Sequence, residues 1–285
     1  MILIISSIID TYIICACFEQ SVERLILLFW YLYRRYLLSN KIIFKKVFDL
    51  PNKKVDSEFD HLAGDYEGLL KQAITLSGDD PDYFAEYKVA DLAQFLRSQL
   101  FFPKSVLDFG SGIGNSIPFF QKYFSDAQLH NADVSLKSNE VAKMRFPGNE
   151  KYLQISNCIP LPDASQDLVF SACVFHHIPP SEQAFWLKEI KRVLKPGGYM
   201  ALYEHNPLNP LTQWAVRNCP LDVNAILIPP SKFRKLVRDL EFTDANAAYK
   251  VFFPKFLASF RKYEAYLEGL PFGAQYRFVA KKPIN

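Results

Sequence analysis

An α/β fold with a mainly parallel β-sheet is the fold class that the sequence predicts. Short apolar runs alternate with helical patterns over residues 101–285, and strands that alternate with helices in this way form parallel sheets. One of these runs, residues 105–109, ends in a glycine-rich turn, which is typical of a buried strand that leads into a helix. The length of 285 residues suffices for one large domain and an extension.

The order of the elements can be read along the chain. The pattern predicts strands near residues 105–109, 128–133, 151–155, 167–173 and 198–204. After these we expect a sixth strand at 247–253, a helix at 255–267 and a last strand at 275–281. Lys195-Pro-Gly-Gly198 separates a helix from the fifth strand, with proline as the stop signal and glycine as the helix C-cap.

Helices are expected before the first of these strands. Phe59, Leu62, Tyr66, Leu69 and Leu70 keep helical spacing. The segment at 78–81 breaks that helix, with Asp79 or Asp80 as the cap of a second helix that opens at residues 83–87.

The glycine-rich turn indicates a particular kind of ligand. Asp108 ends the apolar run, and Gly110, Gly112 and Gly114 follow. A carboxylate at this place repels a pyrophosphate but attracts an ammonium or sulfonium group. The spacing also departs from the G-x-G-x-x-G fingerprint of dinucleotide sites, because neither Asn115 nor Ile117 is a glycine. The turn therefore favours S-adenosylmethionine over a nicotinamide or flavin dinucleotide.

The D-x-G-x-G-x-G pattern resembles the first motif of class I S-adenosylmethionine-dependent methyltransferases. Three further segments follow in the family's order: the acidic end of the second strand at Asp133, the Leu161-Pro-Asp loop at residues 159–170, and the helix and turn at 187–199. The resemblance covers roughly residues 56–283. It implies a seven-stranded Rossmann-like methyltransferase sheet, mostly parallel, whose last strand inserts antiparallel between the preceding two. It also implies a helical lid at 56–100 and a bacterial small-molecule type of enzyme.

The same resemblance implies which residues bind S-adenosyl-L-methionine as a co-substrate. Asp133 would accept hydrogen bonds from both ribose hydroxyls, and it also fits a helix N-cap. Val134 would pack on the adenine. The family's acid for the adenine amine is missing, and Asn157 and Cys158 stand in its place. The expected cofactor-binding residues are Asp108, Gly110, Ser111, Gly112, Asp133, Val134, Asn157 and Cys158.

Catalysis by in-line displacement at the methyl carbon depends mainly on alignment, and a base is needed only for some acceptors. The candidate catalytic residues are Glu204, His205 and His177, each of which also has a structural interpretation. His176 and His177 are adjacent, so we expect one to face the acceptor and the other to pack. No metal site is expected, because no further ligands stand near them in the sequence.

An insertion at about residues 205–230 is expected to build the acceptor pocket. Trp214, Arg217 and Asp222 are candidates to line it, although Arg217 and Asp222 also fit an ion pair with one another. Small-molecule, saccharide and lipid-linked acceptors all remain open, as does the oligomeric state.

The charge distribution argues against a nucleic acid substrate. Residues 1–55 carry eight Lys and Arg against four Asp and Glu, which gives +4, and the remainder carries 25 against 26, which gives −1. The expected catalytic domain therefore has no basic excess to hold a phosphate backbone. The five cysteines are scattered, which indicates free thiols in a reducing, cytoplasmic compartment.

The first 55 residues leave three interpretations open. Residues 1–18 and 25–33 are apolar, but Asp10, Glu19, Glu23 and Arg24 interrupt them, and a basic flank follows. They fit an anchor or interfacial helix at the inner face of a membrane, an extension that arises from an upstream start codon, or an extra packed helix. Two alternative functions are a cofactor-binding or scaffold protein without catalysis, and a nicotinamide-dependent oxidoreductase, which the glycine spacing disfavours.

Overall fold

The structure, a computed structural model, describes residues 79–284. The predictions for residues 1–55 and for the helix at 59–70 lie outside this part of the chain. Within residues 79–284, no helix is both long enough and apolar enough to cross a membrane.

Strands and helices alternate along the described part of the chain, as predicted. The bounds, in chain order, are α4 (Pro81–Ser98), β1 (Ser105–Phe109), α5 (Ile117–Tyr123), β2 (Gln128–Asp133), α6 (Leu136–Arg145), β3 (Lys151–Gln154), β4 (Gln166–Ala172), the 3₁₀ turn η3 (Phe175–His177), α7 (Gln183–Val193), β5 (Leu194–His205), α8 (Pro210–Arg217), η4 (Pro220–Asp222), α9 (Pro230–Asp239), β6 (Thr243–Lys250), η5 (Lys255–Tyr266) and β7 (Gln275–Lys281).

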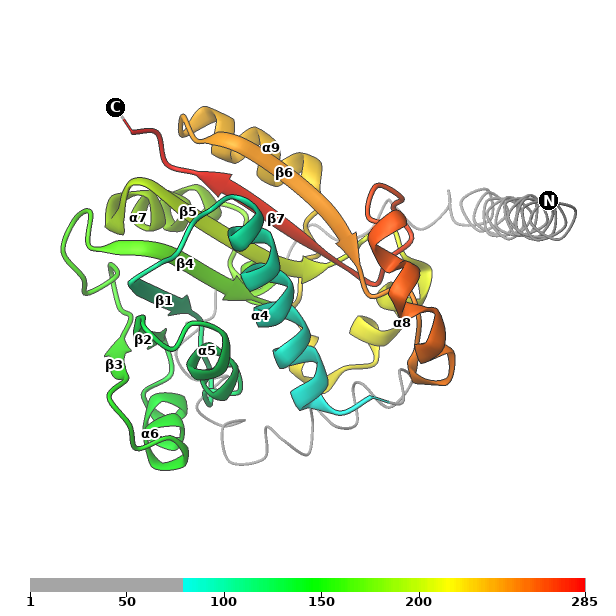
Figure 1. Cartoon of the computed structure of the whole chain (residues 1–285), viewed down its shortest axis with the longest axis horizontal. Coiled ribbons are helices and arrows are strands. Elements are labelled where there is room, and N and C mark those ends of the chain that lie inside the picture. Colours follow the sequence, from blue (N-terminus) through cyan, green and yellow to red (C-terminus); the bar gives the residue numbers. More distant parts are fainter. Residues whose placement is uncertain (1–78, 285) are drawn as a thin grey trace, which may run out of the picture. The chain divides into compact units, whose positions relative to one another are not determined.

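The seven strands form one sheet in the order β3-β2-β1-β4-β5-β7-β6 (Figure 1). β7 pairs antiparallel with both β5 and β6, and the other strand pairs are parallel. The predicted fold, with its last strand inserted antiparallel between the preceding two, is therefore confirmed. In such a sheet the strand order reverses beside β1, so the ends of β1 and β4 open a crevice where ligands bind.

Helices cover both faces of the sheet, and the alternation of side chains along β5 shows why. Tyr199, Ala201 and Tyr203 pack toward α4 and α5, whereas Met200 and Leu202 pack toward α7 and α9. A strand that is buried on both faces has a continuous run of apolar residues, whereas a strand with one exposed face alternates apolar and polar residues. Figure 1 shows α4 and α5 on the near face of the sheet, with α7 and α9 behind it.

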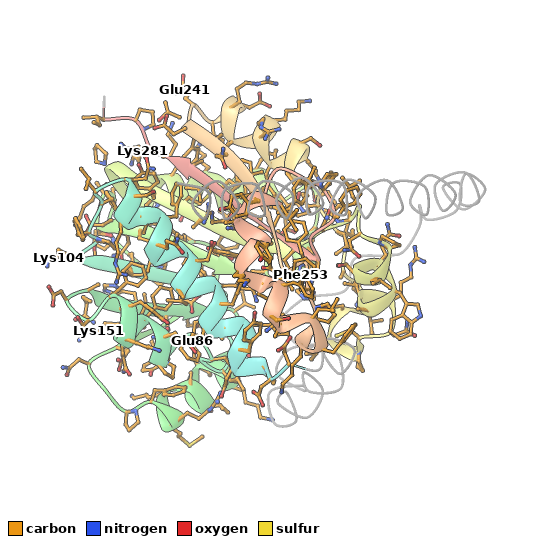
Figure 2. The ribbon with its side chains drawn as sticks, turned by 45° about the vertical axis from the view of Figure 1, so that its right-hand side comes forward. Glu86, Lys104, Lys151, Glu241, Phe253 and Lys281 are labelled. Atoms are coloured by element: carbon orange, nitrogen blue, oxygen red, sulfur yellow. The ribbon has the colours of Figure 1, made fainter. Side chains whose placement is uncertain are left out.

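Two sets of polar contacts fix α4 over the sheet. Glu86 lies on α4 (Figure 2). It binds Lys122 at 2.6 Å and the Tyr123 hydroxyl at 2.8 Å, both at the end of α5. Asp91, one turn further on, accepts hydrogen bonds from Lys250 and Arg277 of the last two strands, at 2.7 and 2.8 Å. The Asp91 contacts are buried and charge-assisted, whereas the Glu86–Lys122 pair is exposed, so the Asp91 contacts contribute most to the position of α4 beside the carboxyl ends of the strands.

The predicted cap of α4 is found at Asp80, whose carboxylate accepts the Asp82 N–H at 3.1 Å. The prediction for Lys195-Pro-Gly-Gly198 is wrong in its details. α7 ends at Val193, its C-cap is Leu194, and β5 already begins there. Gly197, with φ of +78°, instead turns the chain so that its N–H reaches the Lys282 carbonyl at 2.9 Å.

The sixth strand and the segment after it also differ from the prediction. β6 runs over Thr243–Lys250 and not 247–253, because Val251 takes a φ of +61° that interrupts the extended backbone. η5 is a kinked 3₁₀ segment with a non-helical Leu257, where a regular helix was expected. β7, in contrast, has the predicted bounds.

Candidate functional site

A cavity of about 700 Å³ lies at the carboxyl ends of β1, β2, β4 and β5. The glycine turn after β1 and the end of β2 line one part of it, and η3, α8 and the segment before η5 line the other. α4 contributes Phe84 and Lys88 to its wall. This is the crevice that the strand order predicts, and it brings together segments far apart in the sequence.

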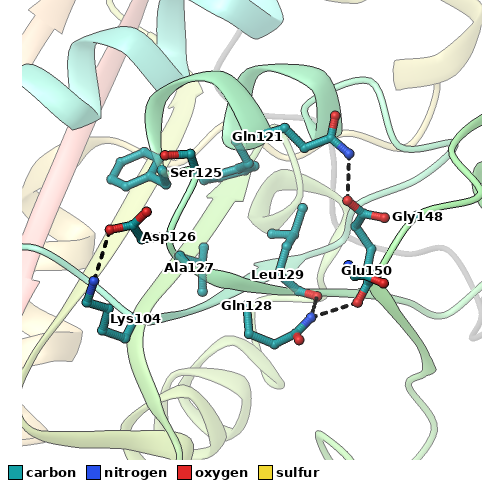
Figure 3. A pocket seen from close by; sticks show the side chains of 13 residues that line it. Lys104, Gln121, Ser125, Asp126, Ala127, Gln128, Leu129, Gly148 and Glu150 are labelled. Atoms are coloured by element: carbon teal, nitrogen blue, oxygen red, sulfur yellow. Dashed lines mark hydrogen bonds and ion pairs between the residues drawn. The ribbon is translucent and has the colours of Figure 1, made fainter.

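A second cavity among the described residues lies at the opposite, amino ends of β1 and β2 (Figure 3). Two pairs of its polar side chains bind each other. Lys104 binds Asp126 at 3.2 Å, and Gln121 donates to Glu150 at 2.6 Å. The first cavity is therefore the candidate functional site.

The three glycines of the turn serve different purposes. A Cβ on Gly110 would lie 2.4 Å from a methyl of Val174, so this glycine allows the turn to pack on the chain after β4. A Cβ on Gly114 would meet Ile117 at 2.7 Å. Gly112 has nothing within 4 Å of the equivalent position and lines the cavity. Its φ of +52° favours glycine, and its open side leaves room for a ligand.

These differences predict that Gly114→Ala mainly lowers stability, whereas Gly112→Ala mainly lowers cofactor affinity. In Gly114→Ala, the methyl group clashes and the backbone is strained at φ of +82°, so the free energy of unfolding should fall by about 2–4 kcal/mol. In Gly112→Ala, stability should fall by only about 1 kcal/mol, while cofactor affinity falls at least about tenfold. Chemical denaturation and calorimetry measure the two quantities. Equal losses of affinity and stability in both variants would contradict this assignment.

Asp108 is the acidic group of the turn, and its side chain is buried. One carboxylate oxygen, Oδ2, has no hydrogen-bond partner, although the residue lines the cavity. Burial and the neighbouring Asp133 raise the pKa of Asp108 to about 8. A cationic group in the cavity would satisfy this oxygen and restore the ionised form, because an opposite charge favours the carboxylate. Ser111, whose buried hydroxyl also lacks a partner, lies beside it.

Asp133, at the end of β2, lines the cavity beside the glycine turn. Its carboxylate accepts the Gly112 N–H at 2.8 Å and the Ser135 N–H at 2.8 Å. It therefore ties the glycine turn to the start of α6, whose N-cap is Ser135 and not Asp133. Both Asp133 and Val134 line the cavity, as the cofactor assignment requires.

Asn157 and Cys158, expected near the adenine, do not line the cavity and are exposed. The neighbouring Ile155 and Ser156 line it instead. The structure therefore does not bring Asn157 and Cys158 to the cavity, and no local signal in the sequence determines the length of this loop.

The other part of the cavity contains a group of polar side chains. His177, His205 and Cys173 line it. Cys173 has a φ of +59°, an unusual conformation for a residue with a side chain. Burial raises the pKa of its thiol, but the charges of Lys88 and His205 outweigh this and lower it to about 7. The sequence analysis did not select Lys88 as a site residue.

Glu204 lies within β5 and is 1% exposed, and it does not line the cavity. One oxygen accepts the N–H groups of Val174 and Phe175 at 3.1 and 2.8 Å, and the other binds His176 Nδ1 at 2.6 Å. Glu204 therefore holds the chain after β4 and the His176 ring in position. It does not line the cavity, so it cannot contact an acceptor there.

His176 and His177 divide their roles as predicted, since His177 lines the cavity and His176 is 1% exposed. The expectation that no further ligand group lies near them is wrong. Asp222 Oδ1 lies 3.3 Å from His176 Nε2 and 3.4 Å from His177 Nε2. Burial opposes the charge on His176, but Glu204 and Asp222 outweigh it and raise the pKa of His176 to about 10. Burial lowers the pKa of His177.

The insertion after β5 holds Asp222 in place. Asn206, fully buried, donates to the carbonyls of Pro271 and Gly273 at 3.0 and 2.7 Å, and Asn209 caps α8. Trp214 and Arg217 do not line the cavity. Arg217 donates to Gln213 at 3.1 Å, so the expected ion pair with Asp222 is not formed.

The family comparison agrees with this geometry. Residues 107–202 match the protein family described as a methyltransferase domain. This match covers about a third of the chain, and the sheet order and the glycine turn agree with a domain of this kind.

Individual relatives extend the comparison. The chain is 29% identical over 155 residues to a ubiquinone/menaquinone biosynthesis C-methyltransferase of Desulfotalea psychrophila, across 54% of this chain and 58% of the relative. It therefore spans little more than half the length of that relative. A SAM-dependent methyltransferase of Archaeoglobus fulgidus shares the fold with a TM-score of 0.55 at 16% identity, across 76% of this chain and all of that one.

A phosphoethanolamine N-methyltransferase of Haemonchus contortus, whose structure contains S-adenosyl-L-methionine, also shares the fold. Its TM-score is 0.53 at 18% identity, and the match covers 82% of this chain and 62% of that one. The activities in the names of these relatives differ in the atom that is methylated, so they do not indicate one acceptor.

Proposed function

We propose that the protein transfers the methyl group of S-adenosylmethionine to a nucleophilic atom of an acceptor bound in the same cavity. The observation that carries this proposal is the continuity of the cavity. Its lining includes the glycine turn with Asp108 and Asp133 on one side, and His177 and His205 on the other. A methyl donor and an acceptor in these two parts would meet in line.

The cofactor residues are assigned from the side chains and glycines that line the cavity. Asp108 binds the ammonium group of the methionyl part, Asp133 binds the ribose hydroxyls, and Val134 packs on the adenine. Gly110, Ser111 and Gly112 form the wall against which the cofactor lies. We assign the contacts at the adenine edge to Ile155 and Ser156, which line the cavity, in place of Asn157 and Cys158.

The transfer forms one bond and breaks one. A lone pair of the acceptor attacks the methyl carbon, the carbon–sulfur bond breaks, and its electron pair stays on sulfur, so that neutral S-adenosylhomocysteine leaves. Alignment of the two reactants supplies much of the acceleration. Where the acceptor loses a proton, His205 or His177 receives it, because both line the acceptor side.

Apolar side chains near the cavity indicate the chemical character of the acceptor. Phe252, Phe253 and Phe256 line it together with Leu211. Phe256 is 81% exposed and Leu211 73% exposed. Exposed apolar side chains grouped around one opening are typical of ligand or membrane contact. They favour an acceptor with a large apolar part, such as a lipid-linked one, over a free saccharide.

Calorimetric titration of the full-length protein tests the cofactor assignment. We expect S-adenosylhomocysteine to bind and NAD⁺ not to bind. Asp133→Ala should weaken S-adenosylhomocysteine at least about thirtyfold, because two hydrogen bonds to a charged group are lost. The control is Asp126→Ala, which removes an exposed carboxylate at the amino ends of the strands. Binding of NAD⁺ in place of the sulfur ligand would overturn the proposal.

Transfer itself is tested with S-adenosylmethionine labelled in the methyl group. The labelled cofactor is incubated with the protein and a cell extract that has been separated into lipid and aqueous fractions. We expect label in the lipid fraction, dependent on Asp133. Label only in the aqueous fraction would reject the apolar acceptor while leaving methyl transfer intact.

A further inference from the structure

The group of His176, His177 and Asp222 is the feature of the cavity that the proposed function does not use. One ligand atom from each residue, Nε2 of both histidines and a carboxylate oxygen of Asp222, lies within 4.8 Å of the others. Two histidines and one carboxylate are a donor set that zinc and other first-row divalent metals prefer. We propose that these three residues bind a divalent transition metal ion, zinc in the first instance.

The two distances from Asp222 to the histidine rings fit the spacing of ligand atoms in a coordination sphere. Zinc–ligand bonds of about 2.0–2.2 Å in a tetrahedral site place neighbouring ligand atoms roughly 3.3–3.5 Å apart. Asp222 Oδ1 lies 3.3 Å from His176 Nε2 and 3.4 Å from His177 Nε2. His176 Nε2 is buried and has no partner in hydrogen-bond geometry. A buried polar atom without a partner is costly, and a metal ion would satisfy it.

Glu204 supplies the support that metal-binding histidines usually have. It binds the other ring nitrogen of His176, Nδ1, at 2.6 Å. A carboxylate at this place fixes the ring so that Nε2 points to the metal. Glu204 is itself held by the N–H groups of Val174 and Phe175. The two carboxylates, Glu204 and Asp222, also provide the two negative charges that balance a divalent cation.

A backbone hydrogen bond already joins the two segments that carry the proposed ligand residues. His176 and His177 lie on the short turn η3, and Asp222 ends η4. The Ile226 N–H donates to the His176 carbonyl at 2.8 Å, which joins the two segments. A preformed arrangement of this kind binds a metal without a large cost of ordering.

The site is open on one side, which distinguishes it from a purely structural zinc site. His177 and Asp222 line the cavity beside His205 and Cys173. A fourth position is therefore accessible to an acceptor. A metal there would polarise an acceptor oxygen and lower its pKa, leaving His205 to receive the proton. This role rests on the proposed function, but metal binding itself does not.

Metal titration of the full-length protein, purified without a polyhistidine tag and stripped with a chelator, tests the proposal. We expect one equivalent of Zn²⁺ by calorimetry, and for Co²⁺ the visible absorption of a four- or five-coordinate ion. His177→Gln and Asp222→Ala should each weaken Zn²⁺ at least about a hundredfold, and Glu204→Gln about ten- to a hundredfold. The controls are His130→Gln and Cys158→Ser, which remove potential ligands outside the group.

S-adenosylhomocysteine binding is measured in the same samples, so that the two proposals fail separately. A protein that binds S-adenosylhomocysteine but no metal overturns the metal site and leaves the proposed function intact. Binding of Zn²⁺ that His177→Gln and Asp222→Ala do not weaken also overturns it, because the metal then lies elsewhere. Weakening confined to His177→Gln, Asp222→Ala and Glu204→Gln supports it, whether or not the cofactor binds.

Discussion

Cofactor affinity is expected to fall about tenfold for each unit by which the pH drops below 8. The pKa of Asp108 is raised to about 8 by burial and by Asp133, so the free protein carries a protonated Asp108 at lower pH. The ammonium group of the cofactor requires the ionised form, and binding must then release a proton. Each unit of pH below the pKa of Asp108 costs about 1.4 kcal/mol of binding free energy. Calorimetry with S-adenosylhomocysteine from about pH 5.5 to about pH 7 measures the slope.

Asp108→Asn provides the control for this prediction. The amide has nearly the shape of the acid but does not titrate, so the variant should bind weakly and with little dependence on pH over the same range. The histidine side chains of the cavity, such as His177, remain in the variant. A slope that persists in Asp108→Asn would therefore assign the pH dependence to the histidines and contradict the role of Asp108.

The sequence predicted the part of the site that is local in the chain. Asp108, Gly110 and Gly112 lie within one turn, and their roles depend on the backbone between β1 and α5. The spacing of glycines determines that backbone directly, because few other residues adopt a positive φ. The bounds of β1, β2 and β7 were also predicted.

The part of the site that depends on contacts distant in sequence was not predicted. Asp222 lies 45 or more residues beyond His177, and only the fold of the insertion brings it to 3.4 Å from that ring. Glu204 was expected to act on the acceptor because it comes at the end of β5. Its side chain is instead buried toward η3. This direction depends on how β5 pairs with β4 and β7, and no local sequence pattern shows that pairing.

The boundaries that were wrong share one physical cause. β6 ends at Lys250 because Val251 adopts a positive φ, although valine is a residue that favours strands. α7 ends three residues before Pro196 because β5 begins pairing with Gln166 at Leu194. In both cases tertiary contacts override the local preference that the sequence analysis used.

Glu204→Ala is expected to lower the free energy of unfolding by about 3–5 kcal/mol, measured with a chelator present. The substitution removes one partner of a buried ion pair and leaves His176 and two backbone N–H groups without their acceptor. Glu204→Gln should cost less, because the amide oxygen still accepts from the backbone. Glu140→Ala, an exposed carboxylate on α6, should have an effect within about 0.5 kcal/mol.

The pH dependence of stability separates this ion pair from simple loss of packing. In the folded wild type the pKa of His176 is raised to about 10, from an ordinary value of 6.5. A raised histidine pKa contributes stability that is fully present below about pH 6.5 and is lost as the pH rises toward 10. Chemical denaturation should therefore show wild-type stability falling over this window. Glu204→Ala should show a smaller fall, because the main group that keeps His176 protonated is gone. Parallel curves for the two proteins would mean that Glu204 contributes by packing and backbone hydrogen bonds alone.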